Sequence, residues 1–447
     1  MALLLPQEFE TYMKVRLGSE FQDFQVALEE NPPTSIRYNP NKASAPTGDQ
    51  VPWSQWGRYL SERPVFTLDP SFHAGAYYVQ EASSMFLEQA VRQTVDLTKP
   101  LTVLDLCAAP GGKSTHALSL LSKESLLISN EVIRSRASIL SENIQKWGHD
   151  NVIVTNNDPE DFQRMPDFFD LIIIDAPCSG EGLFRKEPEA MNQWSPKNME
   201  LCSLRQRRIL NDIWLCLKPG GVLIYSTCTY NENENIDNVA WIRSTYEADS
   251  LPLSLKKEWG IEEIEKERCV GYQCFPHHVK GEGFFLSVLR KASGIPRPHK
   301  SKDTLKYPNR TQTKDISSWI LDPDSQCLFQ HHETVRMIPL GKREEFQVAL
   351  NNLHVVIAGT AILEITKNKF VPDHALALSI KLQKDNFPHI QVSREQALAY
   401  LRKETLNIAS QPLGFALIEY EGLGLGWVNV LQNRINNLYP ATWRIRM

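Results

Sequence analysis

Short apolar runs alternate with amphipathic stretches between residues 95 and 290. We expect six of these runs to be strands, at residues 102–106, 126–130, 152–155, 171–175, 222–226 and 284–289. Their near-continuous apolar character, rather than a polar–apolar alternation, is typical of strands that are buried on both faces. Strands that alternate with helices in this way predict a parallel sheet covered by helices on both sides.

The stretch before residue 222 shows the helical pattern most clearly. Leu210, Ile213, Trp214 and Leu217 recur at i, i+3, i+4 and i+7, which places them on one apolar helix face. Residues 218–221, with the sequence Lys-Pro-Gly-Gly, are predicted to end this helix and to form a turn before the next strand.

The flanking regions follow different patterns, and they predict a division into four parts. Residues 6–30 read as helical, 34–38 as a strand and 39–49 as a linker-like stretch. Residues 291–314 are polar, basic and rich in proline, which is typical of an interdomain connection. Short apolar runs at 353–357, 361–365 and 415–418 then predict a mostly β or α+β region in two parts. The expected parts are therefore 1–94, 95–290, 291–314 and 315–447.

Composition excludes several classes of protein. A chain of 447 residues is long enough for two to four domains at roughly 100–200 residues each. Apolar residues make up 42% and charged residues 23%, which excludes a wholly disordered or collagen-like chain. No apolar run approaches the length of a transmembrane helix, and the first residues lack the basic segment of a signal peptide. We therefore expect a cytoplasmic protein with no membrane partner.

Cysteine usage argues against a metal or disulfide framework. The eight cysteines are irregularly spaced and form no CxxC pair, so we expect free thiols and no metal site. Charge is divided unevenly, because residues 291–447 hold 20 lysines and arginines against 14 acidic residues while the rest of the chain is acidic. A basic C-terminal third is consistent with a polyanionic partner such as nucleic acid.

Residues 104–114, with the sequence Leu-Asp-Leu-Cys-Ala-Ala-Pro-Gly-Gly-Lys-Ser, form the first candidate binding site. A strand ends there, a glycine-rich turn follows and a helix begins, which is an arrangement that binds ligands through backbone amides. The run Gly112-Lys113-Ser114 also invites comparison with a phosphate-binding P-loop. That motif needs a glycine where this chain has Cys107, which argues against it.

Acidic residues follow the next two predicted strands. Glu131 lies 19 positions after Gly112, at the end of the second strand, where a carboxylate suits a ribose diol. The alternative is that Glu131 only caps the helix that follows. Asp158 comes after the third strand and could reach the amino group of a nucleobase.

Two cysteines follow successive strands. Asp175 ends the fourth strand and is followed by Pro177 and Cys178, and the fifth strand leads into Thr227 and Cys228. Either cysteine alone would more often be inert. Two cysteines in matching positions at the ligand-binding edge of a sheet favour nucleophilic chemistry.

Together, the motifs at 105–114, 175–180 and 226–230 resemble those of the Sun-type (RsmB/RsmF) RNA cytosine-5 methyltransferases. Segments at 35–40, 75–84, 276–277 and 281–286 resemble further parts of that family. The C-terminal third looks most like the RsmF branch of 16S rRNA methyltransferases, whose tail is similar to a PUA-type RNA-binding module. The resemblance implies a Rossmann-like methyltransferase sheet between a small N-terminal α/β RNA-binding module and a C-terminal PUA-like RNA-binding region.

The resemblance also implies the cofactor and the roles of individual residues. The methyl donor would be S-adenosylmethionine, and its binding residues would be Cys107, Ala108, Ala109, Pro110, Gly111, Gly112, Lys113, Glu131, Arg136, Asp158 and Asp175. Cys228 would be the nucleophile that adds to carbon 6 of cytosine, and Cys178 would help to release the product. Asp175 would in addition hydrogen-bond the cytosine near ring nitrogen 3.

Ribosomal RNA or the small ribosomal subunit is then the expected partner, and a monomer the expected state. The alternatives are a transfer-RNA substrate, DNA methylation with Cys178 as the nucleophile, or a non-catalytic ribosome-assembly factor. The sheet motifs end by Arg290, so we expect cofactor binding to be independent of residues after about 314. The alternative is that the C-terminal region buttresses the catalytic domain.

Overall fold

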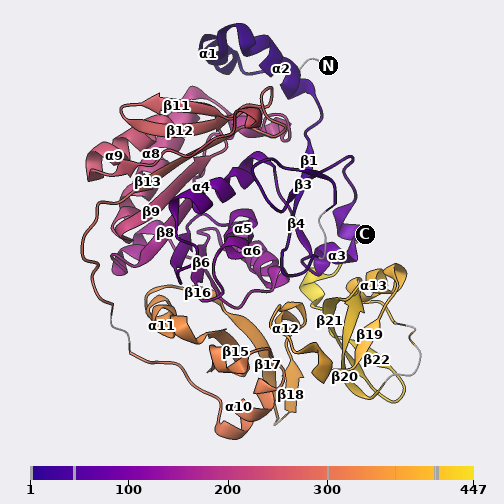
Figure 1. Cartoon of the computed structure of the whole chain (residues 1–447). Helices are drawn as coiled ribbons and strands as arrows, with labels where there is room; N and C mark the ends of the chain where they lie inside the picture. The colour runs from indigo at the N-terminus through magenta and orange to yellow at the C-terminus, as the bar shows by residue number, and fades with distance from the viewer. Residues whose placement is uncertain are drawn as a thin grey trace.

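The computed structural model describes residues 4–43, 47–299, 302–367, 369–406, 408 and 412–446. The expected linkers at 39–49 and 291–314 therefore each include positions outside the described residues, as does the extreme N-terminus. Figure 1 follows the chain from two N-terminal helices through a large central sheet to two sheets in the C-terminal third. Within the described residues, the helices are too short or too polar to cross a membrane.

The N-terminal part begins with the helices that the sequence predicts and continues into a small antiparallel sheet. The helices are α1 (Gln7–Leu17) and α2 (Phe21–Glu29), and they bury Phe9 and Phe24 completely. The sheet has the order β2-β3-β1-β4. Its strands and the helices that follow are β1 (Thr34–Tyr38), β2 (Asp49–Gln50), β3 (Gly57–Leu60), β4 (Tyr77–Val79), α3 (Pro70–His73) and α4 (Leu87–Thr94).

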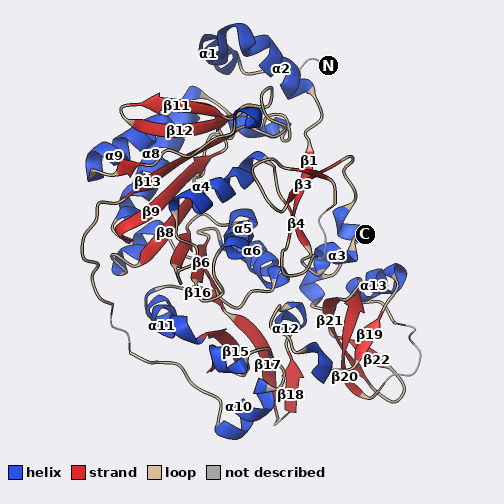
Figure 2. Cartoon of the chain, in the orientation of Figure 1, coloured by secondary structure: helices blue, strands red, loops and turns tan. Residues whose placement is uncertain are grey.

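The central sheet has the order β11-β12-β13-β9-β8-β5-β6-β7-β16, with β10 paired to β13 (Figure 2). Its strands are β5 (Thr102–Asp105), β6 (Leu126–Asn130), β7 (Val152–Thr155), β8 (Phe169–Asp175), β9 (Leu217–Thr227), β10 (Asp249–Ser250), β11 (Glu262–Lys266), β12 (Cys269–Cys274), β13 (Phe284–Arg290) and β16 (Val355–Ala358). The helices between them are α5 (Gly112–Leu120), α6 (Arg134–Trp147), α7 (Pro188–Gln193), α8 (Pro196–Trp214) and α9 (Ile236–Tyr246).

Strand order places the ligand-binding crevice. Strands β5 to β9 run parallel, and β5 has β6 on one side and β8 on the other. The chain order therefore reverses at β5, and ligands of such sheets bind beyond the carboxyl ends of the strands at this switch point. The residues directly after β5 and β8 are those that the sequence singled out.

Consecutive residues of the strands pack on opposite faces, as expected for a sheet that is covered on both sides. Val103 packs in a core cluster with residues of α4, α5 and α6, whereas Leu104 packs with residues of α8 and α9. The predicted parallel sheet is thus confirmed for β5 to β9. The sheet as a whole is mixed, because β13 pairs antiparallel with β9 and continues into the antiparallel β12 and β11.

One expected turn is wrong. Residues 218–221 lie inside β9, which begins at Leu217, although Gly220 keeps a positive φ of 76°. Pairing with β8 extends the strand toward the helix, and the backbone of Gly220 and Gly221 also bonds to the chain at Lys291. These contacts come from distant segments, which a local turn signal does not reveal.

The C-terminal third forms two sheets within its described residues, in agreement with the expected two-part β-rich region. The first has β14 (Gln326–His331), β15 (Thr334–Pro339), β17 (Thr360–Thr366) and β18 (Lys369–Pro372), with the helices α10 (Arg310–Ser317), α11 (Arg343–Asn352) and α12 (His374–Leu378). The second has β19 (His389–Gln391), β20 (Gly414–Tyr420), β21 (Leu423–Val430) and β22 (Ile435–Asn437), with α13 (Arg394–Leu401).

Strand β16 ties this C-terminal third to the central sheet. It pairs antiparallel with β7, through Val355 opposite Thr155 and Ala358 opposite Ile153. Phe346 of α11 is completely buried, contacts the ring of Phe329 and shares a core cluster with Leu104. These contacts support the alternative in which the C-terminal region buttresses the catalytic sheet, rather than the expectation that the sheet is independent of it.

We predict that deleting residues 315–447 exposes β7 and one apolar face of the sheet, and therefore yields insoluble or non-cooperatively folding protein. The substitution Phe346→Ala should lower the free energy of unfolding by about 3–5 kcal/mol, because it leaves a cavity in the shared core. Urea denaturation monitors both changes, with Leu340→Ala as a control because that side chain is 47% exposed. A soluble truncation with the midpoint of the full chain would contradict the buttress.

Candidate active site

The loops after β8 and β9 bring the two predicted cysteines together. The Sγ atoms of Cys178 and Cys228 lie 3.0 Å apart, and both residues are half-buried. The backbone of the two loops is joined directly, because Gly182 N–H donates to the carbonyl of Cys228. The two cysteines follow neighbouring strands at matching positions, and their side chains are therefore in direct contact at the crevice.

A buried carboxylate, Glu181, holds the Cys228 loop from the side of the Cys178 loop. Its Oε2 accepts hydrogen bonds from the hydroxyl of Thr229 at 2.6 Å and from the backbone N–H groups of Tyr230 at 2.8 Å and Asn231 at 3.0 Å. Its Oε1 accepts from the indole of Trp194. Burial removes these donors from water, so each needs an acceptor within the protein. The Glu181 carboxylate accepts hydrogen bonds from all of them.

A second buried carboxylate, Glu234, holds the Cys178 loop in the reverse direction. Its Oε2 accepts from the backbone N–H of Ser179 at 3.0 Å and from the amide of Gln206 at 2.7 Å. The side-chain amide of Asn231 donates to Oε1 of Glu234 at 2.8 Å and to Oε1 of Glu181 at 3.1 Å. We call Glu181, Asn231 and Glu234 the loop clamp.

The environment of Cys178 keeps its thiol protonated. The hydrogen bond with Cys228 and burial raise the pKa of Cys178 well above its usual value. Of the remaining cysteines, Cys202 and Cys216 are buried in the core. Cys269, Cys274 and Cys327 are buried as well.

Lys113 and Asp175 form an ion pair that faces the cysteines. Their Nζ and Oδ2 atoms lie 2.7 Å apart, and the hydroxyl of Ser226 donates to the other carboxylate oxygen at 3.0 Å. Burial works to lower the pKa of Lys113, but the charges of Asp175, Asp105 and Cys228 outweigh it and raise that pKa above its usual value. The raised pKa favours the protonated form of the lysine, whose charge interacts with Cys228.

The glycine-rich turn after β5 is shaped as the sequence predicts. Gly111 has a φ of 115° and directly precedes α5, a conformation that favours glycine. The N–H of Ala108 donates to the carbonyl of Asn130, which ties the turn to the end of β6. Asp105, which sequence reasoning did not single out, lies fully buried at the base of the turn and accepts from Ser114 at 2.6 Å.

Glu131 lies at the end of β6 and has two contacts. Its Oε1 accepts from the N–H of Ile133 at 2.9 Å, at the start of α6. This oxygen therefore caps the helix, which is one of the two roles expected from the sequence. Its Oε2 lies 3.4 Å from the guanidinium of Arg136. Arg136 also donates to the carbonyl of Ala109 at 2.7 Å, which joins Glu131 to the turn after β5.

Asp158 lies after β7, as expected, and its Oδ1 is engaged by protein groups. It begins the 3₁₀ helix η4 (Pro159–Arg164), accepts from the N–H of Glu160 at 3.1 Å and pairs with Arg208 of α8. Of the acidic residues predicted around the crevice, Asp158 is thus the one whose carboxylate is most clearly committed to the local fold.

The charges around the turn suit a cationic ligand. Burial and the negative charges of Asp105, Asp175 and Glu131 raise the pKa of the Cys107 thiol above its usual range. Burial likewise raises the pKa of Asp105 to about 7, and its Oδ1 has no hydrogen-bond partner among the described residues. A sulfonium and an ammonium group, both present in S-adenosylmethionine, fit this concentration of acceptors.

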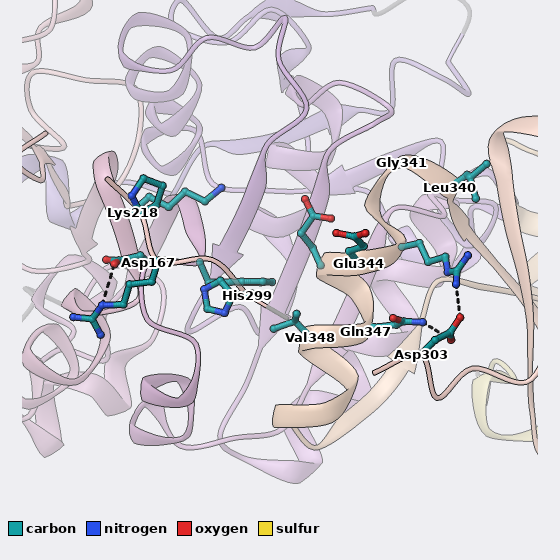
Figure 3. Close-up of a pocket in the computed structure, with 14 residues that line it drawn as sticks. Asp167, Lys218, His299, Asp303, Leu340, Gly341, Glu344, Gln347 and Val348 are labelled. Atoms are coloured by element: carbon teal, nitrogen blue, oxygen red, sulfur yellow. Dashed lines mark hydrogen bonds and ion pairs between the residues drawn. The ribbon is translucent and has the colours of Figure 1, made fainter. Parts of the chain in front are cut away.

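A cavity of about 920 Å³ lies at the opposite edge of the sheet (Figure 3). It is lined by Asp167 and Lys218, near the amino ends of β8 and β9, and by residues of α11. Several of its charged groups already form pairs, as between Arg297 and Asp167 at 3.5 Å. The cavity therefore does not belong to the candidate site.

Sequence reasoning missed the loop clamp. The three residues stand within a few positions of the cysteines, in polar runs that read as exposed loop. The available signal was a set of carboxylate and amide residues at the ends of two apolar strands, where a loop that lies over a buried crevice needs partners for its backbone.

We predict that Asn231→Ala lowers the free energy of unfolding by about 3 kcal/mol or more, because two buried carboxylates each lose a hydrogen bond worth about 1.5–3 kcal/mol. Asn233→Ala is the matched control, since this residue is exposed and two positions away. Urea denaturation measures the change. Equal stability of the two variants would show that the clamp does not hold the loops.

Comparison with known proteins gives matches along most of the chain. A model described as 16S rRNA methyltransferase RsmB/F matches residues 93–290, and a model of the N-terminal domain of RsmF matches residues 5–82. The model named Methyltransferase RsmF PUA domain matches residues 387–445.

Curated relatives named ribosomal RNA small subunit methyltransferase F match nearly the whole chain. The protein from Shewanella loihica is 30% identical over 416 residues, which cover 88% of this chain and 83% of the relative. The protein from Escherichia coli K12 is 28% identical, over 97% of this chain and 95% of its own.

Two solved structures share the catalytic fold. A methyltransferase homologue from Pyrococcus horikoshii is 25% identical with a TM-score of 0.53, and covers 64% of this chain and 100% of its own. NSun6 from the same organism, solved with SFG, is 20% identical with a TM-score of 0.55, over 66% of this chain and 100% of its own. With the matches along most of its length and the paired cysteines at the sheet edge, the chain belongs to the RsmB/F family of 16S rRNA methyltransferases.

Proposed function

We propose that Cys228 and Cys178 divide between them the chemistry of methylating carbon 5 of cytosine in small-subunit ribosomal RNA. The observation that carries this proposal is the pair of sulfur atoms 3.0 Å apart at the ligand-binding edge of the sheet. Membership of the family makes the chain an S-adenosylmethionine-dependent RNA methyltransferase. A non-catalytic assembly factor would have no need of two thiols in this arrangement.

Covalent catalysis explains why a thiol is needed. Carbon 5 of cytosine is a weak nucleophile, and addition of the Cys228 thiolate to carbon 6 makes it enamine-like. S-adenosylmethionine, when bound, supplies an electrophilic methyl group to this carbon. A base must then remove the proton from carbon 5 so that the bond between Cys228 and carbon 6 can break.

We propose that Cys178 serves this second half of the reaction. Its raised pKa means that the thiol is protonated before substrate binds, and that its S–H can donate to the sulfur of Cys228. Such a hydrogen bond stabilises a Cys228 thiolate. In the release step, the S–H of Cys178 gives its proton to the Cys228 sulfur as the bond to carbon 6 breaks, and the Cys178 thiolate that results takes the proton from carbon 5, so both cysteines end as thiols.

Asp175 and Lys113 are proposed to bind the cytosine and the charge that develops on it. The Asp175 side chain is 37% exposed, so it remains accessible from the crevice while Lys113 and Ser226 hold it. A carboxylate held in this way can accept hydrogen bonds from the cytosine edge, with little reorganisation during the reaction.

The cofactor is proposed to bind at residues 107–113, with Glu131 on the ribose hydroxyls and Arg136 beside it. Asp175 provides negative charge that suits its cationic end. The Oδ1 of Asp105, which lacks a partner in the part of the chain that the structure describes, provides a further hydrogen-bond acceptor. The adenine contact assigned to Asp158 has the least support, because Arg208 and Glu160 already engage one of its oxygens.

The regions on either side of the catalytic part bear on how RNA is bound and on which RNA is the substrate. We propose that residues 1–94 and 315–447 contact RNA on either side of the catalytic part 95–290, with 291–314 as the connection. Ribosomal RNA is favoured over transfer RNA because the curated relatives are named ribosomal RNA small subunit methyltransferase F. This chain matches them over 83% and 95% of their own length. The proposed setting is the cytoplasm, where small ribosomal subunits are found, with the enzyme as a monomer.

We predict that Cys228→Ala and Cys178→Ala fail at different steps. Cys228→Ala should abolish methyl transfer without trapping RNA, because no covalent intermediate can form. Cys178→Ala should accumulate a covalent protein–RNA adduct that survives denaturing gels, because release is blocked. The readout is incubation with 16S rRNA and S-adenosylmethionine, and Cys202→Ala serves as the control thiol. An adduct with Cys228→Ala and none with Cys178→Ala would reverse the two roles.

We predict that Glu131→Ala weakens binding of S-adenosylmethionine roughly tenfold or more, because one charge-assisted hydrogen bond is worth about 1.5–3 kcal/mol. Isothermal titration calorimetry measures the affinity, and Glu160→Ala is the control because it changes an exposed acidic residue nearby. Unchanged affinity in Glu131→Ala, together with reduced stability, would leave Glu131 with the capping role alone.

A further inference from the structure

Away from the cysteines, the described residues Glu20, His277 and His278 bring three potential metal ligands together. Their donor atoms all lie within 4.8 Å of one another. Glu20 ends the 3₁₀ helix η1 (Gly18–Glu20) between α1 and α2, and the histidines belong to the loop after β12. The Nε2 atom of His278 lies 3.2 Å from Oε2 of Glu20, and that of His277 lies 3.6 Å from the same oxygen.

His277 is the unusual member of this cluster. Its side chain is only 4% exposed, yet neither ring nitrogen has a hydrogen-bond partner among the described residues. Buried polar groups in folded proteins nearly always have a partner, so this imidazole calls for one.

Aromatic side chains hold the His277 ring in place. Phe24 of α2 and Phe275 each lie 5.7 Å from it, measured between ring centroids. Phe275 in turn stacks on Tyr230, two residues after Cys228, with centroids 5.4 Å apart and planes tilted by 7°. The cluster thus lies between the N-terminal helices and the loop that carries the proposed nucleophile.

We propose that Glu20, His277 and His278 bind one zinc ion, with water as the fourth ligand. Two imidazoles and one carboxylate are a donor set typical of three-ligand zinc sites, whereas magnesium and calcium prefer oxygen ligands alone. Tetrahedral bonds of about 2.0–2.1 Å place the donor atoms about 3.4 Å apart. The Glu20 side chain is 52% exposed and free to make the small movement that this requires.

The ion would add a metal link between two parts of the chain that already share an aromatic core, in which Phe9 and Phe24 pack against Tyr230 and Phe275. Figure 1 shows α1 and α2 at the periphery of the molecule, above β11 and β12 and linked to the rest through β1. Zinc held by Glu20 on this helical pair and by the histidines after β12 would fix the pair against the Phe275–Tyr230 stack. The ion would therefore link these two segments, and this link does not depend on the roles proposed for the cysteines.

The test is zinc binding by the full chain after dialysis against EDTA. Isothermal titration calorimetry with zinc chloride should show one equivalent, bound with micromolar or tighter affinity, and the thermal midpoint should rise with zinc. Glu20→Gln and His278→Gln should each weaken binding at least tenfold. Both side chains are partly exposed, so these variants avoid the folding risk of replacing His277. Glu10→Gln, an exposed acidic residue of α1 paired with Lys14, is the matched control.

The paired thiols are a second place where zinc could bind, so they need their own variant. Cys178→Ser/Cys228→Ser should retain the equivalent that Glu20→Gln loses. Binding that disappears in the double cysteine variant and persists in Glu20→Gln would place the metal on the thiols and overturn the proposal. Absence of binding by the unmodified chain would overturn it as well, and would leave Glu20 and His278 as an ion pair.

Discussion

Two sulfur atoms can face each other at 3.0 Å only while the loops after β8 and β9 are held against each other. Neither loop has regular secondary structure to do this at that point. Glu181 reaches from the first loop to the backbone of the second, Glu234 reaches from the second to the first, and Asn231 joins the two carboxylates. Reciprocal hydrogen bonds of this kind restrict the distance between the sulfurs more tightly than packing alone. Hydrogen bonds are directional, and a buried donor has no water molecule as an alternative partner.

The sheet determines where the crevice lies, because its parallel strands end there. The charged side chains beyond β5, β6 and β8 determine which ligands the crevice suits. Three carboxylates surround a turn whose ligand is expected to be cationic, and one lysine stands beside the thiols. Lys113 comes from the turn itself and pairs with Asp175, so the carboxylate proposed to contact the cytosine is held by a cation of the proposed cofactor-binding turn.

Local patterns in the sequence were enough for the strands and the turn. The strands at 126–130 and 152–155 have the predicted bounds, because each is a buried apolar run between polar breaks. Glycine and proline at 218–221 signal a turn locally, and only the pairing of β9 with distant segments shows that these residues lie in a strand. The roles of Glu181 and Glu234 could not be read from the sequence, since a buried carboxylate and an exposed one look alike until the fold provides its donors. Glu131 is an intermediate case. Its Oε1 has the helix-capping contact that the sequence offers as one alternative, and its Oε2 faces Arg136 beside the proposed cofactor site.

The pairing of β7 with β16 has a consequence for how the protein is made. Thr155 and its partner Val355 are separated by about 200 residues of chain. At a synthesis rate of roughly 5–20 residues per second, β7 emerges from the ribosome about 10–40 s before the strand that covers it. Throughout that interval the central sheet has an open edge, which is the part of a sheet most prone to join another chain. Nascent copies translated close together on one messenger RNA are therefore the molecules most at risk of mispairing, and a slow codon run between residues 155 and 355 would lengthen their exposure.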